Sequence, residues 1–515
     1  MTDLSVQRKT TQRAGAAQHK IRFVTATSLF DGHDASINVM RRILQASGAE
    51  VIHLGHNRSV DEIVTAALDE DVQGIAVSSY QGGHVEFFQY MLDLLRERGG
   101  AHIKVFGGGG GVIVPAEAAL LHAYGVTRIY TPEDGAKLGL QGMIDDMLAA
   151  CDFDPSALAV IDLDHVARGG RRALSALITA LENAALDPPL RAELARRAGA
   201  AKRVPVLGIT GTGGSGKSSL TDEVVRRLRL DQGDRLKIAL IAVDPSRRKS
   251  GGALLGDRIR MNAIGTPNIY MRSLATRAAG SEIAACVPEV IAACTIAGFD
   301  LIMIETSGIG QGDAAIVPLV DVSVYVMTPE YGAASQLEKI DMLDFADFVA
   351  INKFDRKGGA DAQRDVRKQV QRNHAAFGAA PEEMPVFGTI AARFNDDGVT
   401  ALYQALKVRL AAAGLALETG SLAPVAVRAS TGNVSIVPSS RVRYLAEIAD
   451  AVRGYHERAR AQVRIARERQ QLTQTLRMLR EASPPPALLH ARGRVNSTHP
   501  LRAKRGRVRE AALLR

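Results

Sequence analysis

The stretch that decides the fold of the middle of the chain is residues 206–230, "VLGITGTGGSGKSSLTDEVVRRLRL". An apolar run leads into a complete G-x-x-x-x-G-K-S motif, and an amphipathic run follows, which is the strand–loop–helix context that this motif requires. Backbone N–H groups of such a loop close around phosphate oxygens at a helix N-terminus, and the lysine reaches the β- and γ-phosphates. The sequence therefore predicts a nucleotide-binding α/β domain. We expect the phosphates to be held by Gly211, Gly213, Gly214, Ser215, Gly216, Lys217, Ser218 and Ser219.

A second motif, "VAINKFD" at residues 349–355, favours a guanine base. Its N-K-x-D spacing resembles the guanine-reading motif of GTPases. The carboxylate of Asp355 can accept hydrogen bonds from guanine N1–H and N2–H₂ together, which adenine cannot offer. Lys353 would pack along the base, and Asn352 would contact the base edge or brace the loop, with Phe354 beside them. Together with the phosphate loop, this motif predicts GTP and GDP as ligands.

Acidic residues at predicted strand ends suggest a Mg²⁺ site near the phosphates. Glu305 closes the apolar run "LIMIE", Asp244 closes "IALIAVD", and Asp257 lies in the segment that follows Asp244. Oxygen ligands around one hard cation suit Mg²⁺, and Ser218 and Thr306 would add hydroxyls. Each acid could instead be a helix cap or a solvated loop residue. Lys217, Glu305 and Asp244 are the candidate catalytic groups, and Arg260 is a candidate source of positive charge at the phosphates.

Residues 20–150 alternate strand-like and helix-like segments. The candidate strands are 21–27, 49–55, 74–79, 103–108 and 127–132, and amphipathic runs such as 37–47, 59–70 and 84–98 lie between them. Five βα units of this kind predict a parallel sheet covered on both faces. Their size and number suit the flavodoxin-like strand order 2-1-3-4-5.

Three loops of this first domain are unusual. "DGHDAS" (31–36) follows the first strand, "SSYQGGH" (78–84) the third, and "GGGGG" (107–111) the fourth. In the expected order these strands are neighbours, so their loops share the edge where open α/β sheets bind ligands. One histidine, two serines and a channel without side chains would suit a long, thin ligand tail beside a metal bound by imidazole. The alternative is that His33 is an ordinary solvated or structural loop histidine.

These three loops resemble the cobalamin-binding domain of adenosylcobalamin-dependent acyl-CoA mutases, whose pattern is D-x-H-x-x-G, S-x-L and G-G. The resemblance implies that His33 is the lower axial cobalt ligand and that Asp31 hydrogen-bonds its other ring nitrogen. It also implies that glycines admit the nucleotide tail of the cofactor beside a serine. Ser36 stands where the family has glycine, and Tyr80 where it has leucine. The implied cobalamin site is Asp31, His33, Ser36, Ser78, Gly82, Gly107 and Gly108.

The second domain resembles the G-protein chaperones that load and protect such mutases, through "GTGGSGKSS", "VDPSRRKSGGALLGDRIRM", "ETSGIGQGD" and "NKFD". A cobalamin domain followed by a G domain on one chain is similar to the fused isobutyryl-CoA mutase family. In that family residues 328–343 would be a switch that relays the nucleotide state to the mutase. The family continues into a barrel that binds the acyl-CoA, and we expect no isomerisation of isobutyryl-CoA to n-butyryl-CoA from this chain without a barrel.

Length and composition limit the remaining choices. The chain has 515 residues, three cysteines and a net charge of +9, of which residues 481–515 supply +6 through eight basic and two acidic side chains. A nucleic-acid partner is disfavoured because the other 480 residues are nearly neutral and no basic aromatic motif accompanies them. No apolar run is long enough for a membrane span, and no secretory signal is evident, so we expect a cytoplasmic protein.

The expected domain order is a cobalamin-binding domain (20–150), a helical linker (151–201), a P-loop GTPase domain (202–415), a helical linker segment (416–480) and a basic disordered tail (481–515). The helix expected over residues 438–480, with Ser439 or Ser440 as its cap, could mediate a homodimer. Three functions compete: a Mg²⁺-dependent GTPase that gates cofactor loading, a cobalamin carrier that uses GTP only as a conformational signal, and part of an isomerase that works with a barrel from another chain.

Overall fold

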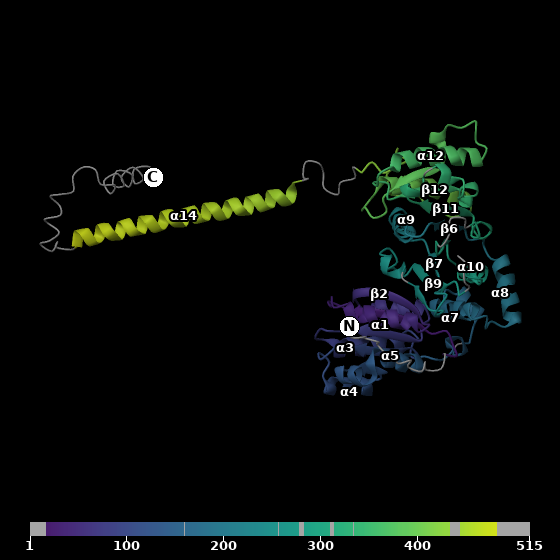
Figure 1. Ribbon diagram of the computed structural model, residues 1–515, viewed down its shortest axis with the longest axis horizontal. Coiled ribbons are helices and arrows are strands. Elements are labelled where there is room, and N and C mark those ends of the chain that lie inside the picture. Colours follow the sequence, from purple (N-terminus) through teal and green to yellow (C-terminus); the bar gives the residue numbers. More distant parts are fainter. Residues whose placement is uncertain are drawn as a thin grey trace, which may run out of the picture. The chain divides into compact units, whose positions relative to one another are not determined.

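The computed structural model describes residues 17–158, 160–255, 257–277, 283–308, 314–332, 334–432 and 443–481 (Figure 1). The chain divides into two compact units, residues 1–434 and 435–515, and each is treated separately below. Because residues 1–434 form one unit, the boundaries expected at residues 150, 201 and 415 stay predictions. Across the described ranges, no helix is long and apolar enough to cross a membrane.

The first sheet has the expected parallel order. Its strands are β1 (Arg22–Ser28), β2 (Glu50–Arg58), β3 (Gly74–Ser78), β4 (Lys104–Gly108) and β5 (Arg128–Tyr130), arranged β5-β4-β3-β1-β2. Helices α2 (Val60–Asp69), α3 (His84–Glu97) and α4 (Pro115–Tyr124) cover one face, and α1 (Ala35–Ala46) and α5 (Pro132–Ala150) cover the other. Neighbouring strand residues point to opposite faces, so Val24 packs beneath α2 and α3 while Phe23 packs beneath α1 and α5. The flavodoxin-like prediction is confirmed.

A sixth strand joins this sheet from far along the sequence. Strand β8 (Ala253–Leu255) pairs in parallel with β2, with Ala253 opposite Glu50 and Leu255 opposite Ile52. Both Ala253 and Leu255 are fully buried in the core of the first sheet. The sequence predicts that this segment lies wholly in the second domain, because three residues are too few to show a strand pattern.

The second sheet has seven parallel strands in the order β13-β12-β11-β6-β10-β7-β9. They are β6 (Val206–Gly211), β7 (Ile238–Asp244), β9 (Ile269–Ala275), β10 (Leu301–Glu305), β11 (Val322–Met327), β12 (Phe348–Asn352) and β13 (Val386–Thr389). Helices α9 (Lys217–Gln232) and α13 (Asp397–Ala412) cover one face. The other is covered by α10 (Val287–Ile296), α11 (Ala334–Leu337) and α12 (Gly359–Asn373). Short 3₁₀ helices lie in the connections: η2 (Asp257–Arg260), η3 (Val317–Leu319), η4 (Pro329–Tyr331), η5 (Asp341–Asp344) and η6 (Pro381–Glu383).

The expected linker helices belong to the core of the second sheet. After η1 (Pro155–Leu158) come α6 (Leu163–Ala167), α7 (Arg171–Glu182) and α8 (Pro188–Ala200). Leu174, Leu177 and Ile178 of α7 are buried against β7, β9 and α10. Residues 151–201 therefore serve as a packed layer of the second sheet as well as a connection.

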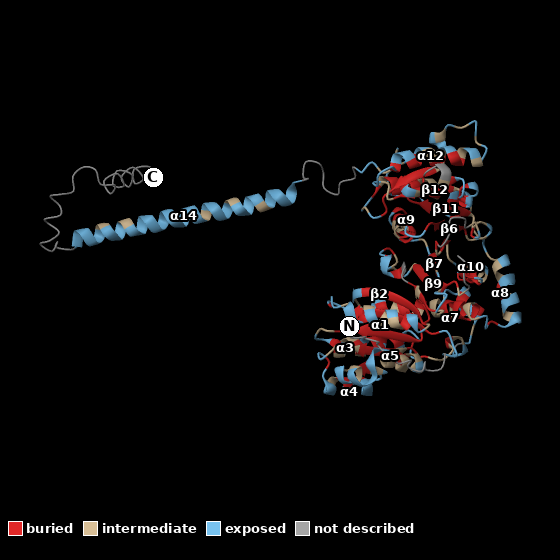
Figure 2. Cartoon of the chain, in the orientation of Figure 1, coloured by how far each residue is buried: buried red, intermediate tan, exposed pale blue. Residues whose placement is uncertain are grey.

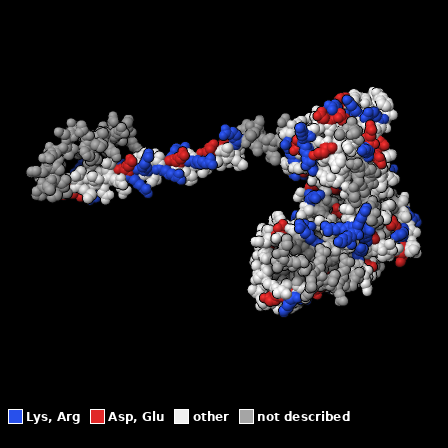
Figure 3. Space-filling model, in the orientation of Figure 1, with Lys and Arg blue, Asp and Glu red and all other residues white. Residues whose placement is uncertain are grey.

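The region expected to be helical from residue 416 is helical only in its later part. Residues 416–432 are irregular, and Ala429 forms a backbone bridge to Gly388 at the end of β13. The helix of the second unit is α14 (Tyr444–Glu481), which buries no side chain within its own unit (Figure 2). Its eight arginines and five carboxylates are interspersed along its length (Figure 3). The candidate caps Ser439 and Ser440 and the basic tail from residue 482 lie outside the described residues.

Candidate cofactor and nucleotide sites

The loop after β1 places a buried carboxylate against an exposed imidazole. Asp31 is fully buried, whereas the His33 side chain is 74% exposed. Asp31 Oδ2 accepts a hydrogen bond from the backbone N–H of Tyr80 at 2.5 Å. Asp31 Oδ1 accepts one from the backbone N–H of His33 at 2.9 Å and lies 2.8 Å from His33 Nδ1. The sequence-predicted pair is therefore formed, and Tyr80 holds it from the loop after β3.

The ionisation of Asp31 fixes the tautomer of His33. Burial alone would raise the pKa of Asp31, but the N–H groups of Tyr80 and His33 and the imidazole together lower the pKa below its ordinary value. Asp31 is thus a carboxylate at neutral pH and can only accept hydrogen bonds. His33 Nδ1 must then carry the proton, and in the neutral imidazole Nε2 keeps its lone pair. This nitrogen is available to a metal ion.

A cavity of about 510 Å³ opens beside this pair, between α1 and α5 and above β3 and β4. Tyr80 links the cavity to the histidine loop, because its hydroxyl lies 2.6 Å from Ser36 Oγ and its ring centre lies 5.6 Å from that of His33. The lining includes the predicted Ser36, Ser78, Gly107 and Gly108 and the apolar Ile37, Met40, Phe106, Tyr130 and Met143. Gly82 is exposed in the turn before α3 and does not line the cavity.

The glycines at the end of β4 have different roles. A Cβ added at Gly108 would make only an ordinary contact, 3.5 Å from the Tyr130 backbone oxygen, so packing does not require this glycine, and its missing side chain leaves room at the cavity floor. A Cβ added at Gly107 would lie 2.6 Å from Ile129 and from Phe88 of α3. Gly107 therefore permits packing on the opposite face of the sheet, while Gly108 clears room for a ligand. The apolar, glycine-floored cavity beside His33 fits the nucleotide tail and metal of a cobalamin.

The phosphate loop follows β6, the central strand of the second sheet, and leads into α9. Gly216 takes φ +90° as the N-cap of α9, a conformation that disfavours other residues. Lys217 Nζ donates hydrogen bonds to the backbone oxygens of Gly211 at 3.0 Å and Thr212 at 3.3 Å. The hydroxyls of Thr212 and Ser215 are buried without a hydrogen-bond partner among the described residues, which fits a loop built to surround a phosphate. Of the eight predicted phosphate-contacting residues, Gly211 ends β6 and the others lie in this loop and at the start of α9.

Two of the predicted Mg²⁺ ligands touch directly. Ser218 Oγ donates to Glu305 Oε1 at 2.8 Å. Glu305 lies opposite Ala242 of β7, so Asp244, two residues further on, ends its strand at the same edge of the sheet. The Thr306 hydroxyl lies 2.8 Å from that of Thr210 inside the sheet.

The remaining predicted groups do not complete an acidic cluster. Within the described ranges, no three His, Cys, Asp or Glu side chains lie close enough together to hold a metal ion. Asp257 begins η2, but its side chain lies outside the described residues, and Arg260 is exposed at the end of η2. Ser218 and Glu305 are thus the protein groups best placed for a Mg²⁺ that keeps several waters.

The guanine motif is tied to the phosphate loop. Asn352 ends β12, and its amide donates from Nδ2 to the Ser215 backbone oxygen at 2.8 Å. Lys353 Nζ donates to the Gly214 backbone oxygen at 2.7 Å. Phe354 lies over Gly388, where an added Cβ would come within 2.5 Å of the ring, and Asp355 is exposed in the turn that follows. The two motifs therefore form one site, with Asn352 as the brace.

Three features at or near these sites were not predicted from the sequence: a backbone donor, part of the cavity wall and a contact of α9. The Tyr80 backbone donor to Asp31 has no sequence signal, because any residue but proline could supply it. Phe106, Tyr130 and Met143 of the cavity wall lie on elements that were expected, and strand alternation from Gly108 places Phe106 on the same face. Asp222 of α9 binds the backbone N–H groups of Asn262 and Ala263 at 2.8 and 2.7 Å, a contact without a motif.

Two open parallel sheets, one with an Asp–His loop and cavity and one with a phosphate loop braced by a guanine motif, define a B12-binding protein joined to a GTPase. Family comparison agrees: the profile "Methylmalonyl Co-A mutase-associated GTPase MeaB" matches residues 174–483 and the profile "B12 binding domain" matches residues 21–137. The chain belongs to this family of mutase-associated GTPases and carries a B12-binding domain ahead of the GTPase. Both resemblances seen in the sequence are confirmed.

Several relatives are fused isobutyryl-CoA mutases. The chain is 67% identical to that of Cupriavidus metallidurans over 488 residues, which cover 94% of this chain and 45% of the relative. It is 61% identical to that of Nocardia farcinica, with 88% of this chain and 42% of the relative covered. It is 58% identical to that of Geobacillus kaustophilus, with 87% and 42% covered. The chain thus spans less than half the length of these curated relatives.

Proposed function

We propose that this chain is a Mg²⁺-dependent GTPase that binds adenosylcobalamin and whose nucleotide state controls transfer of that cofactor to an acyl-CoA mutase barrel. One observation carries the proposal: within a single compact unit, the ionised Asp31 presents His33 Nε2 beside an apolar cavity, and a braced phosphate loop lies on the neighbouring sheet. A metal-binding imidazole and a nucleotide switch on one unit suit a protein that loads a cofactor.

GTP hydrolysis needs charge at the phosphates and a held metal ion. Lys217 supplies a positive charge from within the loop, and backbone N–H groups at the start of α9 add a positive dipole end. Ser218 would bind Mg²⁺ directly, with Glu305 holding it directly or through water. Asp244 is at the same edge for a second water-mediated contact. Asp355, exposed after the braced Asn352, would select guanine.

Cobalamin binding needs a nitrogen ligand of fixed orientation and room for the nucleotide tail. Asp31 holds the His33 ring, and the cavity over Gly108, walled by Ser36 and Ser78, would receive the tail. When bound, adenosylcobalamin supplies a weak carbon–cobalt bond for radical rearrangement. The protein's part is to orient the ring with Nε2 toward the metal and to exclude water from the tail.

The partner proposed for the loaded cofactor is the substrate barrel of an isobutyryl-CoA mutase, on the same or another chain. This proposal rests on the similarity to fused mutases and on the mutase-associated GTPase family. The two sheets of the described residues are open, so isomerisation of isobutyryl-CoA to n-butyryl-CoA would need that barrel in addition. The three free, buried cysteines fit a reducing cytoplasm, and a homodimer through α14 stays a prediction.

Two measurements test the proposal. Purified chain should hydrolyse GTP with Mg²⁺, and Lys217→Ala should abolish hydrolysis while leaving the cobalamin spectrum unchanged. Adenosylcobalamin should bind with its own base displaced and a histidine nitrogen on cobalt, as read by absorbance and electron paramagnetic resonance of the cob(II)alamin form. His33→Ala should lose that signature and leave GTP hydrolysis unchanged. A His33→Ala variant with unaltered spectrum and affinity would remove the cobalt assignment.

The alternatives differ in what they predict. A carrier that uses GTP only as a signal would bind both ligands but turn over GTP no faster than Lys217→Ala. If the chain is part of an isomerase, isobutyryl-CoA should be converted when a separate barrel subunit is added. The phosphate loop with its paired Ser218 and Glu305 favours the GTPase.

A further inference from the structure

A second cavity, of about 610 Å³, lies between α2 of the first sheet and residues 261–267, which precede β9. Of the described residues that line it, none lines the cobalamin cavity and none belongs to the phosphate loop. Its volume falls within the roughly 300–1,000 Å³ that is usual for small-molecule sites. The function proposed above makes no use of this space, so its lining needs a separate explanation.

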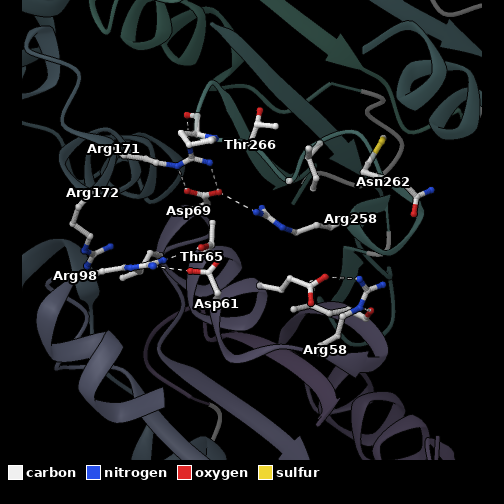
Figure 4. A pocket seen from close by; sticks show the side chains of 17 residues that line it. Arg58, Asp61, Thr65, Asp69, Arg98, Arg171, Arg172, Arg258, Asn262 and Thr266 are labelled. Carbon is white, nitrogen blue, oxygen red and sulfur yellow. Dashed lines mark hydrogen bonds and ion pairs between the residues drawn. The ribbon is translucent and has the colours of Figure 1, made fainter. Parts of the chain in front are cut away.

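Five arginines reach this cavity from four parts of the chain. Figure 4 shows their side chains placed around it. Among the described residues, the lining holds three carboxylates, so positive side chains outnumber negative ones. Guanidinium groups that converge from distant segments are typical of a site for an anionic ligand. Arg58 ends β2, Arg98 follows α3, Arg171 and Arg172 begin α7, and Arg258 lies in η2.

Three of the arginines are fixed in the wall of the cavity by buried carboxylates. The Asp69 side chain is 1% exposed and lies 2.6 Å from Arg171 Nε and 2.9 Å from Arg258 Nη2. Arg258 also donates to Glu70 Oε1 at 3.3 Å, and Arg172 is paired with a fully buried carboxylate. Breaking such pairs would leave a buried charge without its partner. These arginines therefore keep their positions and give the cavity a rigid wall.

The other two arginines are held only by exposed carboxylates. Arg58 Nη1 lies 3.0 Å from Glu62, which is 49% exposed, and Arg98 Nη2 lies 2.6 Å from Asp61, which is 62% exposed. Ion pairs this exposed contribute little to stability, so either carboxylate can turn into solvent at small cost. A phosphate could then take its place, because a guanidinium donates two parallel hydrogen bonds to phosphate oxygens.

The rest of the lining combines apolar surface with hydroxyl groups. Leu54 and Leu68 contribute apolar surface from β2 and α2, and Met261 contributes it from the segment opposite α2. The Thr266 hydroxyl is buried without a hydrogen-bond partner among the described residues. A buried hydroxyl is normally satisfied, and a ligand oxygen beside Thr266 would satisfy this one. The lining thus suits a ligand with an anionic head and an apolar body.

We propose that this cavity binds a small organic phosphate, with the phosphate on Arg58 and Arg98 and the carbon skeleton against the apolar wall. The inference goes beyond the proposed function, because the site is separate from those for GTP and cobalamin. A phosphate monoester has three terminal oxygens and up to two negative charges, whereas a carboxylate has two oxygens and one charge. Two arginines from separate elements are therefore matched better by a phosphate than by a carboxylate.

The test is calorimetric titration of the full chain with phenyl phosphate, in Mg²⁺ and a saturating non-hydrolysable GTP analogue that fills the phosphate loop. Inorganic phosphate lacks the apolar body and phenylacetate lacks the phosphate, so each should bind about 10-fold more weakly or worse. Arg58→Gln and Arg98→Gln should each weaken phenyl phosphate binding by about 10-fold or more, the usual effect of losing hydrogen bonds to a charged group. Arg235→Gln is the matched control, because Arg235 pairs with the exposed Glu418 away from the cavity.

Hydrogen exchange gives a second test that needs no variant in the cavity. Phenyl phosphate should slow exchange of the amides of residues 262–266 and leave those of β4 unchanged. Lys217→Ala should bind phenyl phosphate as the unmodified chain does, and loss of binding in that variant would place the probe in the phosphate loop instead. The proposal is also wrong if phenyl phosphate does not bind, if both cavity variants bind it with full affinity, or if phenylacetate binds equally well. None of these results depends on GTP hydrolysis or on cobalamin binding, so they leave the proposed function to its own tests.

Discussion

Glu50→Gln is expected to destabilise the first unit strongly, because Glu50 lies at the centre of buried ion pairs between the two sheets. Its carboxylate is 1% exposed and accepts from Arg22 at 2.7 and 3.1 Å and from Arg277 at 2.8 Å. Arg22 in turn donates to Glu182 at 2.8 Å, and Glu182 also binds Arg272. Arg22 lies in β1 and Glu50 in β2 of the first sheet. Arg272 lies in β9, Arg277 follows β9, and Glu182 lies in α7, so the pairs join elements of both sheets.

The magnitude follows from the ionisation of Glu50. Burial would raise its pKa, but Arg22 and Arg277 lower the pKa from 4.5 to about 2. At ~1.4 kcal/mol per pH unit this corresponds to about 3 kcal/mol of unfolding free energy at pH 7. It agrees with the ~3–5 kcal/mol cost of leaving a buried charge without its partner. Because the folded pKa is lowered, the contribution is complete above about pH 4.5 and declines as the pH falls toward 2.

Urea titrations followed by circular dichroism would measure the difference between the unmodified chain and Glu50→Gln at pH 7 and pH 4. The matched control is Glu418→Gln, since Glu418 pairs with Arg235 at 2.5 Å but both side chains are more than half exposed. The control should change stability by no more than ~0.5 kcal/mol. Equal effects of the two substitutions, or a Glu50→Gln effect larger at pH 4 than at pH 7, would refute the electrostatic reasoning.

Three further predictions concern the sites. Asp31→Asn should weaken cobalamin binding by roughly 10–100-fold, because a neutral amide no longer enforces the Nδ1–H tautomer; absorbance titration at fixed pH measures it. Gly108→Leu should abolish cobalamin binding by filling the cavity floor while GTP hydrolysis is unchanged, and retained binding would place the tail elsewhere. Removal of Mg²⁺ with EDTA should stop GTP hydrolysis and leave the cobalamin spectrum intact, as phosphate-release and absorbance assays would show.

The parts of the fold that sequence predicts are those encoded locally. The order of the first sheet follows from five βα units, and the phosphate loop is a contiguous motif whose strand and helix flank it. The N-K-x-D residues are also contiguous, and their position at the end of β12 brings them beside the loop. In each case a local sequence motif lies at the carboxyl end of a strand. Because a parallel sheet brings these strand ends to one edge, the local motif also predicts where its residues lie in the fold.

The parts that sequence could not predict depend on contacts between distant segments. Strand β8 has three residues, and it becomes a strand only because β2 offers an unpaired edge. The ion pairs around Glu50 join positions from Arg22 to Arg277, and each charged residue taken alone would be predicted to lie at the surface. Residues 416–432, by contrast, carry Gly420, Pro424 and Gly432, which disfavour a helix, so their irregular course was open to prediction from the sequence.

The histidine shows where local and distant information must combine. The "DGHDAS" loop places Asp31 two residues before His33, but proximity alone leaves open which ring nitrogen carries the proton. That choice depends on Asp31 being ionised while fully buried, and the ionisation depends on the N–H of Tyr80, which approaches from the loop after β3. In a chain with the same hexapeptide but with the loop after β3 placed elsewhere, burial would raise the pKa of the aspartate. Its histidine would then lose the fixed acceptor that keeps Nε2 available to cobalt.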